Sequence, residues 1–505
     1  MSKRLRPKRT CMACFGIGLS MMLLFWNDLD ILEGDDPTIH ILVLFVDHWE
    51  PTYDTLDEES RQLWMQEYPA FAKKLRDFHG RPLQHTWFYW NGTSGGWTAP
   101  DSLHITSLTR LVYEGFGEIE VHIHHAEDGT PEEAYSAFVQ KMESFLEAGA
   151  RWGLYTPIEN CEQKTFAFIH GMWALDNSRR TGKAANTHRE HCGVNLELTA
   201  LKQLGCYADF TFPAWGPMNP KRMSALYYVR DDPRPWSYGY DENIFPMVVG
   251  GEPQGDLLLF QGPRSPMPSS EESQGLSLSN MDRWVAEGVH VKGQPKWKFV
   301  KLHTHGIQQA GRRTGNERLE GPALLWGEPA ARFWTGVLEK YNDGKKYRLH
   351  FITAREAYNI ARAAESGKKG DPYDYLDYII SPYVCNRVHS LSPFELIAWK
   401  KGMAELRMAN KSGCVQISIK RDGFDRVEES GDGVLWTLGD GQLDVLDGLE
   451  ITMKDATPSL WYRFHYHSRP LWPSLLSAIN GFSGSEPWRP NATSSMQGPL
   501  FALKE

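Results

Sequence analysis

The sequence predicts an α/β fold: a distorted barrel of seven or eight β/α units, followed by a small antiparallel β module. Two observations predict this class. From residue 38 onward, short apolar runs alternate with amphipathic helical patterns, which is typical of a parallel sheet whose strands are joined by helices. Beyond residue 385, the pattern changes to short β-like runs between Gly and Asp turns. An open doubly wound sheet is the alternative architecture for the first part.

Eight apolar runs are predicted as the strands of the main sheet. They cover residues 38–46, 84–90, 118–125, 165–171, 207–212, 256–261, 297–305 and 347–352. The first run is apolar without interruption from Ile41 to Val46, as expected for a strand buried on both faces. Because helical segments separate the runs, the strands should be parallel, and a barrel is the most economical way to bury them.

Two helix starts can be read directly from the sequence. Thr130 and Glu133 have the spacing of a capping box, with Pro131 at the first helical position. Apolar residues then recur at helical spacing as far as Leu146. A second capping box begins at Thr353, immediately after the last predicted strand of the sheet.

The chain divides into four predicted parts. Residues 1–36 form a basic segment with a signal anchor and linker, residues 37–385 the barrel, residues 386–480 a helix plus the small β module, and residues 481–505 a loose tail. The β-like runs of the module are residues 415–420, 434–438, 443–445, 450–453 and 460–466.

The amino-terminal segment resembles a signal sequence or short membrane anchor. Five cations between residues 3 and 9 precede an apolar run at residues 11–26, and no obvious cleavage site follows. We therefore expect a chain anchored in, or secreted through, the cell envelope by a single amino-terminal span. The alternative is a cytoplasmic enzyme with a disordered basic tail.

Composition excludes several classes of protein. Lys and Arg total 54 against 63 Asp and Glu, a net charge of −9, which argues against a nucleic-acid partner. Seven Cys, without dense spacing, do not form a disulfide scaffold, and the pair Cys11 and Cys14 has no second half of a zinc or redox motif. The 19 Trp residues form either core or a cleft for a ring-shaped ligand. The oligomeric state stays open.

Ionisable residues collect where the predicted strands end. Parallel β/α domains place their sites at the carboxyl ends of strands. Such residues follow the first, third, fourth and seventh predicted strands, at residues 47–50, 122–128, 170–177 and 303–306. We therefore expect one cleft lined by these four segments.

The pair His122 and His124 is the first indication of a metal site. Two residues apart on a strand, their side chains share a face and reach one ion, whereas His125 points the other way unless the strand has already ended. Asp47 and His48 would add an oxygen and a nitrogen ligand from the neighbouring strand, a set that suits zinc or another first-row divalent ion. The alternative is a group of hydrogen-bonded core histidines.

His303 and His305 likewise share a strand face. They come from the far end of the chain, as an acid–base group converging on a barrel mouth should. The alternatives are a second structural histidine pair or additional metal ligands.

Three strand segments together resemble a known family. The first strand ends in Asp47, a later strand reads Glu-x-x-x-His up to His122, and a third reads Leu-His at His303. This pattern is similar to the polysaccharide deacetylase (NodB-homology) superfamily of glycoside hydrolase and deacetylase β/α barrels, over residues 38–370. More closely, an uncharacterised bacterial subgroup is similar in the runs VDHWEP, EVHIHHAEDGTPE, GMWALDNS, CGVN, FVKLHTHG and YRLHFITAREAYNI.

The resemblance implies a barrel that binds one divalent metal ion, zinc with manganese, cobalt or nickel as alternatives. Carried over by position, Asp47 is the catalytic base, His303 the general acid, and His48 and His122 are metal ligands. The family's second metal histidine falls at Ala126, so His124 or His125 must replace it. The family's acidic pair is Asp-His here, and Glu50 is the alternative source of the missing carboxylate. The expected substrate contacts are Glu50, Trp173, Asp176 and His305, with Trp49, Trp173 and Trp215 as walls for a sugar ring.

The predicted function is therefore metal-dependent hydrolysis of a carbohydrate substrate, the removal of N- or O-acetyl groups from a polysaccharide or glycan. A glycoside hydrolase that pairs Asp47 with Glu50 or Asp176 is one alternative. A carbohydrate-binding protein without turnover is the other.

Overall fold

The computed structural model describes most of the chain between residues 38 and 466. The segments outside it are residues 1–37, 52–54, 91, 94–95, 98–101, 126, 128, 179–192, 215–218, 265–275, 308–312, 315–316, 319–324, 401–402, 409–416, 421–423, 431–436, 439–441, 447–449, 455–460 and 467–505. The predicted anchor, the predicted tail and Trp215 therefore lie outside the described residues. Among the described helices, none is long and apolar enough to span a membrane.

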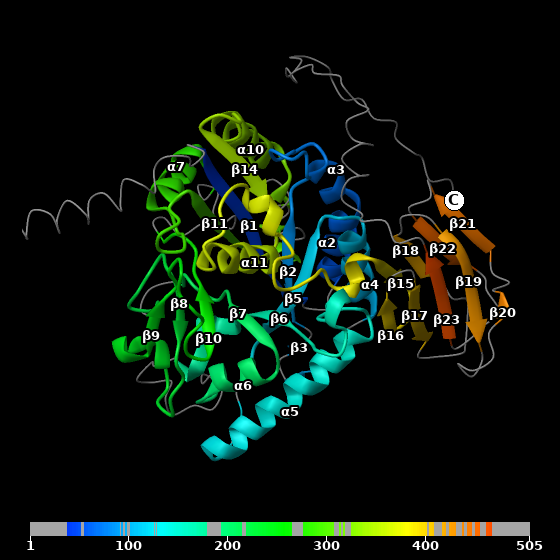
Figure 1. The fold of residues 1–505 in the computed structure, drawn as a ribbon, viewed down its shortest axis with the longest axis horizontal. Coiled ribbons are helices and arrows are strands. Elements are labelled where there is room, and N and C mark those ends of the chain that lie inside the picture. The colour runs from blue at the N-terminus through cyan, green and yellow to red at the C-terminus, as the bar shows by residue number, and fades with distance from the viewer. Residues whose placement is uncertain are drawn as a thin grey trace, which may run out of the picture.

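A ten-stranded sheet forms the centre of the molecule (Figure 1). Its strands are β1 (Ile39–Trp49), β2 (His85–Tyr89), β5 (Gly117–Ile123), β6 (Phe166–His170), β7 (Cys206–Asp209), β8 (Leu226–Val229), β9 (Ile244–Pro246), β10 (Leu257–Phe260), β11 (Trp297–Thr304) and β14 (Tyr347–Phe351). The hydrogen-bonded order is β11-β1-β2-β5-β6-β7-β10-β8-β9, with β14 also paired to β1. All eight predicted strands are found and their mutual pairing is parallel, whereas β8 and β9 were not predicted and pair antiparallel.

Strand β1 is the hub of this sheet. It pairs with β11 from His40 to Asp47, with β14 from Ile39 to Val43, and with β2 only from Asp47 to Trp49. Every residue from Ile41 to Val46 is at most 4% exposed, as the uninterrupted apolar run predicts.

The sheet curls into a half-barrel (Figure 1). The ammonium group of Lys301 on β11 crosses its interior and donates hydrogen bonds to the carbonyl oxygens of Phe210, Phe212 and Phe260 beyond β7 and in β10. The α/β class predicted from the sequence is confirmed.

Helices flank the sheet (Figure 1). They are α2 (Thr55–Gln66), α3 (Tyr68–Ala72), α4 (Ser102–Tyr113), α5 (Pro131–Ala150), α6 (Glu197–Gln203), α7 (Leu278–Glu287), α10 (Glu328–Tyr341) and α11 (Ala354–Glu365). Short 3₁₀ turns are Ile158–Asn160, Gly171–Trp173, Leu175–Asn177, Ser237–Gly239, Asp241–Asn243, Pro372–Tyr375 and Val384–Asn386, and two small hairpins pair β3 (Gly92–Thr93) with β4 (Gly96–Trp97) and β12 (Arg313–Thr314) with β13 (Glu317–Arg318). Both predicted capping boxes are present, at Thr130 and at Thr353.

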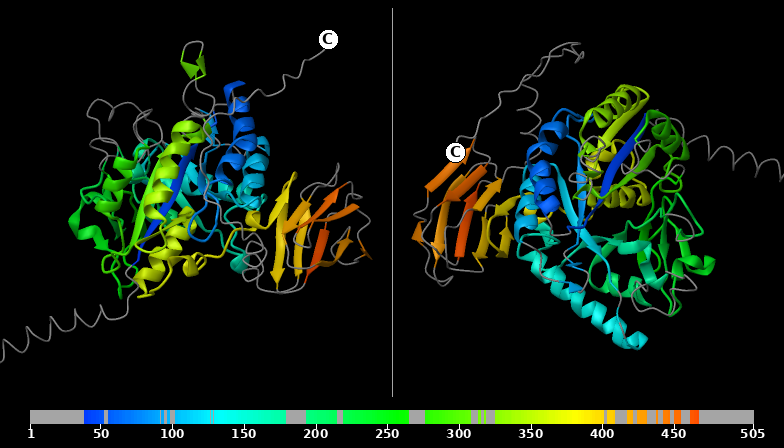
Figure 2. Two further views of the ribbon diagram at one scale, coloured as in Figure 1. Left: turned by 90° about the horizontal axis from the view of Figure 1, so that it is seen from above. Right: turned by 180° about the vertical axis from the view of Figure 1, so that it is seen from behind.

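Two antiparallel sheets follow the α/β part and lie to one side of it (Figure 2). Their strands are β15 (Val388–Ser390), β16 (Phe394–Lys400), β17 (Met403–Met408), β18 (Ile417–Lys420), β19 (Phe424–Ser430), β20 (Thr437–Leu438), β21 (Gln442–Leu446), β22 (Glu450–Lys454) and β23 (Trp461–Tyr466). One sheet has the order β15-β18-β22-β21 and the other β16-β17-β23-β19-β20.

The helix expected within residues 386–480 is not found among the described residues there. In β17 the buried residues Ala404, Leu406 and Met408 alternate with more exposed ones, a period of two that suits a strand. This alternation places Leu406 and Met408 in a small second core together with Phe394 of β16.

Candidate metal and active site

The pleat of the sheet sorts the ionisable strand-end residues into two sets. Residues that pair in register point to the same face, and neighbours along a strand point to opposite faces. Val46 pairs with His303, so His48 and His303 share a face. His48 also pairs with Phe88, and Phe88 with Glu120, which places His122 on that face too. The histidines that converge on this face are therefore His48 of β1, His122 of β5 and His303 of β11.

The carboxylate of Glu50 lies among the imidazole rings of four histidines. Its Oε1 atom is 2.7 Å from Nε2 of His122 and 3.1 Å from Nε2 of His124. The same oxygen is 3.6 Å from Nδ1 of His48 and 3.6 Å from Nε2 of His305. Three separate strand ends, those of β1, β5 and β11, therefore direct nitrogen atoms at one oxygen.

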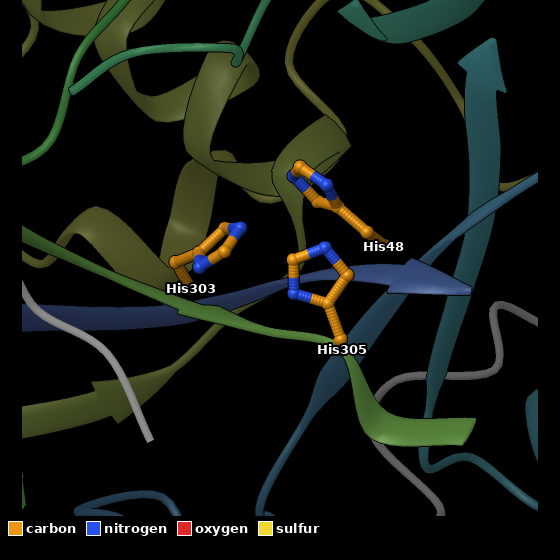
Figure 3. Close-up of side chains that lie close together, drawn as sticks. All are labelled: His48, His303 and His305. Atoms are coloured by element: carbon orange, nitrogen blue, oxygen red, sulfur yellow. The ribbon is translucent and has the colours of Figure 1, made fainter. Parts of the chain in front are cut away.

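The ring of His48 links the two halves of this group. Its centroid is 4.5 Å from that of His122, 4.4 Å from that of His303 and 4.7 Å from that of His305. Figure 3 shows the rings of His48, His303 and His305 gathered in one space. The Nε2 atom of His48 is buried without a hydrogen-bond partner among the described residues. A buried nitrogen of this kind has a lone pair or a proton to offer to a ligand.

These donors fit a divalent ion of the zinc class. The Nε2 atoms of His122 and His124 are 3.1 Å apart, close to the roughly 3.3 Å that separates two nitrogens bound tetrahedrally to one zinc. Nδ1 of His122 lies 2.9 Å from the carbonyl oxygen of Ile169, to which it can donate. That contact leaves the Nε2 lone pair for a metal, as in most metal-bound histidines.

The protonation states suit the same role. Burial, and then the neighbouring His122, hold the pKa of His48 well below its usual range, and burial also lowers the pKa of His122. Burial opposes ionisation of Glu50, but its contacts with the ring nitrogens of His122, His124 and His48 outweigh burial and hold its pKa well below the usual range. Glu50 is therefore ionised near neutral pH and His48 and His122 are neutral, which are the forms that bind a divalent cation.

Asp47, predicted as the catalytic base, points away from this group. It pairs with Thr304 on β11, and its fully buried carboxylate lies on the helix side of the sheet. Oδ2 is 2.7 Å from Nε2 of His85, and Oδ1 accepts a 2.7 Å hydrogen bond from the backbone N–H of Gly306. The carboxylate that the structure places among the histidines is Glu50, three residues later.

His125, the alternative metal ligand, also faces away from the other histidines. Its Nε2 is 3.0 Å from Oε1 of Glu197, and Nε2 of His170 on β6 is 3.4 Å from the same oxygen. All three side chains are buried. Burial lowers the pKa of His125 to about 3 and that of His170 to about 4. His124 rather than His125 therefore joins His122, and a second, closed His–Glu–His group lies on the other face.

Of the remaining predicted contacts, Trp173 is near the histidines and Asp176 is not. The ring centroid of Trp173 is 6.3 Å from that of His303. The carboxylate of Asp176 is buried and accepts a hydrogen bond from the backbone N–H of Ser237. Trp49 is a core residue, since its ring is fully buried and packs on Trp64.

The segment after β6 has a strained backbone. Met172, Trp173, Asp176 and Asn177 all have φ between 49° and 57°, a region that non-glycine residues occupy only where surrounding contacts enforce it. Such strain is common at functional sites, and here it sets the position of the Trp173 ring beside His303.

Sequence reasoning missed His85 and Glu197. Each contacts a predicted site residue, Asp47 or His125. Neither was predicted, because neither lies at the carboxyl end of a predicted strand. His85 is at the amino end of β2, and Glu197 opens α6.

Comparison with models of protein families found no match, and neither did comparison with curated proteins. Among solved structures, 4-alpha-glucanotransferase from Thermococcus litoralis is similar at a TM-score of 0.29 and 10% identity, over 63% of this chain and 41% of that chain. The chain thus spans less than half the length of that enzyme. A likeness at this level is no evidence for a shared activity.

Proposed function

We propose that this protein is a metal-dependent hydrolase that removes acetyl groups from a carbohydrate. One observation carries the proposal: a single carboxylate oxygen of Glu50 lies within 3.6 Å of ring nitrogens of four histidines from three strand ends. A metal ion bound here, on the side open to solvent, could keep a position for water or substrate, as catalytic metal sites do.

The ion would be held by ligands drawn from His48, His122, His124 and Glu50, with one position left for water or substrate. A divalent ion bound there would polarise a carbonyl group and lower the pKa of a water molecule. The geometry supports this ligand set because the two Nε2 atoms of His122 and His124 already lie at a ligand–ligand distance.

His303 and His305 would carry the protons. Both rings face the same space as His48, from the end of β11. In hydrolysis, the oxygen of water bonds to the acetyl carbon while the bond from that carbon to the sugar nitrogen or oxygen breaks. His305 would accept the proton that water loses, in place of Asp47, and His303 would give a proton to the leaving sugar group.

The site can be reached from solvent. The side chains of His124 and His305 are 27% and 22% exposed, whereas those of His48 and His122 are almost completely buried. The exposed side is bordered by Trp173, a flat ring on which a sugar can stack. The inference that the substrate is a carbohydrate is based on this ring and on the resemblance of the strand motifs to polysaccharide deacetylases.

Cleavage of a glycosidic bond is less well supported. That reaction requires two carboxyl groups that face the substrate, roughly 5–10 Å apart. Asp47 and Asp176 both turn into the protein and accept backbone N–H groups, so neither can pair with Glu50 across a cleft. Removal of an acetyl group needs no second carboxylate.

The proposal is tested by metal content and acetate release on the purified chain, using a panel of N- and O-acetylated glycans. We expect His122→Ala to lower the zinc content by one ion per chain and to reduce acetate release at least a hundredfold. His290→Ala, which removes a histidine that lies beside the carbonyl of Gly288 far along the chain, should change neither quantity.

Three results would overturn the proposal. The first is a fully folded wild-type chain whose zinc content His122→Ala leaves unchanged. The second is release of shortened glycans without acetate, which would identify a glycoside hydrolase. The third is glycan binding with no product from any member of the panel, which would identify a carbohydrate-binding protein.

A further inference from the structure

A second group of metal-ligating side chains lies at the other end of β1. His40 is near the start of β1, His350 is on β14, His79 is in the turn before β2, and Asp371 follows α11. His40 and His48 are eight residues apart on one strand, so this group is roughly 26 Å from the candidate active site. The two groups cannot share an ion.

Three of these donors are arranged around a common point. Nδ1 of His40 is 2.8 Å from Nε2 of His350, and each of these nitrogens is 3.9 Å from Oδ1 of Asp371. A point equidistant from the three atoms is about 2.1 Å from each, which is the bond length of zinc to histidine nitrogen and carboxylate oxygen. The space between the donors therefore has the size of a divalent ion of this class.

His79 supplies a fourth donor. Its Nε2 is 3.2 Å from Oδ2 of Asp371, and its ring stacks on Tyr373 with centroids 4.0 Å apart. The backbone N–H of His79 donates to Asp77, which fixes the turn that carries it. With His79, three imidazoles and one carboxylate would be available to fill the four positions of a tetrahedral zinc ion.

The carboxylate of Asp371 is held in position by other contacts. Oδ1 accepts a 3.0 Å hydrogen bond from the backbone N–H of Tyr373. Nη1 of Arg348 lies 3.5 Å from Oδ2, the oxygen that Nε2 of His79 also contacts. These contacts orient the carboxylate as the outer partners of metal ligands do, and they leave Oδ1 facing the two buried histidines.

Burial keeps the histidines in the form that binds metal. His40 and His350 are almost completely buried, and burial lowers the pKa of His350 to about 3. Asp371 and His79 are partly exposed, so an ion can enter from solvent.

We propose that His40, His79, His350 and Asp371 bind one divalent cation of the zinc class as a structural site. The ion would join the start of β1, strand β14, the turn before β2 and the segment after α11, which are far apart in the sequence. This site is separate from the proposed catalytic centre and does not depend on the proposed function.

The test uses the full chain loaded with zinc, with metal content and thermal unfolding as readouts. Asp371→Asn and His79→Ala should each lose one zinc ion per chain relative to the wild type, and a chelator should lower Tm less in these variants than in the wild type. Asp374→Asn, which alters an exposed aspartate in the same segment, should match the wild type in both readouts.

The two sites are distinguished by combining variants. His122→Ala should keep the zinc ion that Asp371→Asn loses, and Asp371→Asn should keep the ion that His122→Ala loses. Both test positions are partly exposed, so the variants should fold even where replacement of the buried His350 prevents folding. Wild-type zinc content in both Asp371→Asn and His79→Ala would overturn the proposal, and so would a wild-type Tm unaffected by zinc and chelator.

Discussion

Asp47 and His48 are neighbours in the chain with different surroundings. The pleat of β1 turns Asp47 to the helix side, where it holds His85 and the backbone of Gly306, and turns His48 to the candidate metal site. Gly306 is required there, because a Cβ atom at this position would lie 2.2 Å from Oδ2 of Asp47. Asp47 thus positions the residue directly after His305.

We predict that Asp47→Asn destabilises the fold and leaves the metal content unchanged. The amide presents N–H groups where the carboxylate accepts from His85 or Gly306, so a buried donor loses its partner, at a cost of about 1–3 kcal/mol. Urea unfolding measures the loss, with Asp241→Asn at an exposed site as the control. Wild-type unfolding together with abolished acetate release would instead restore Asp47 as the catalytic base.

At this scale, much of the candidate site follows from the sequence. Side-chain alternation correctly predicts that His122 and His124 reach one point and that His125 points the other way. The same rule, applied across β1 and β11, separates Asp47 from His303, but only once the register of the two strands is known. The convergence of Glu50 depends on the chain leaving β1, which no local pattern fixes.

At the scale of elements, two helices begin with the same capping box in different surroundings. Thr130 is exposed at the start of α5, and its box satisfies only the local backbone. Thr353 is buried at the start of α11, and its hydroxyl also donates a 2.7 Å hydrogen bond to Glu118. Glu118 in turn pairs with the buried Arg355, so this box joins a strand of the sheet to the helix.

We predict that Thr353→Ala costs roughly 2–3 kcal/mol of stability and Thr130→Ala about 1 kcal/mol. Both lose a helix cap, but only Thr353→Ala removes a donor from a buried carboxylate. The free energies of urea unfolding of the two variants test this difference. Equal losses would show that the hydrogen bond to Glu118 contributes nothing.

Elements with a strong periodic signal were predicted well, and the others were not. The eight parallel strands are short apolar runs bounded by turns, which a sequence shows directly. Strands β8 and β9 follow one another without a helix between them, and their pairing depends on β10, which comes later in the chain. In β16 and β17 charged residues mask the period-two pattern, which led to a predicted helix.

At the scale of the whole molecule, a buried histidine contributes to the contact between the α/β part and the antiparallel sheets. His389 on β15 lies 3.3 Å from the hydroxyl of Thr109 in α4. Burial, assisted by the charge of Arg110, lowers the pKa of His389 to about 4. The folded chain therefore holds this ring neutral at a pH where an unfolded chain protonates it.

We predict a loss of stability on acidification that His389→Gln reduces. Between about pH 6.5 and about pH 4 the unfolded state takes up a proton that the folded state refuses, so stability falls as the pH falls, by at most roughly 3 kcal/mol for this residue. Urea unfolding of wild type and His389→Gln at about pH 7 and about pH 4.5 isolates this contribution from that of other buried histidines. Identical acid dependence would contradict the prediction.

The position of β1 as hub has a consequence for synthesis of the chain on the ribosome. β1 is the first described strand to be made, but its partners β11 and β14 are among the last of the sheet, and β2 touches only its final residues. At about 5–20 residues per second, the roughly 250 residues between β1 and β11 take on the order of 10–50 s to appear. During that time a strand with an unbroken apolar run from Ile41 to Val46 stays unpaired in the growing polypeptide, which is the kind of segment that chaperones bind and that aggregates form around.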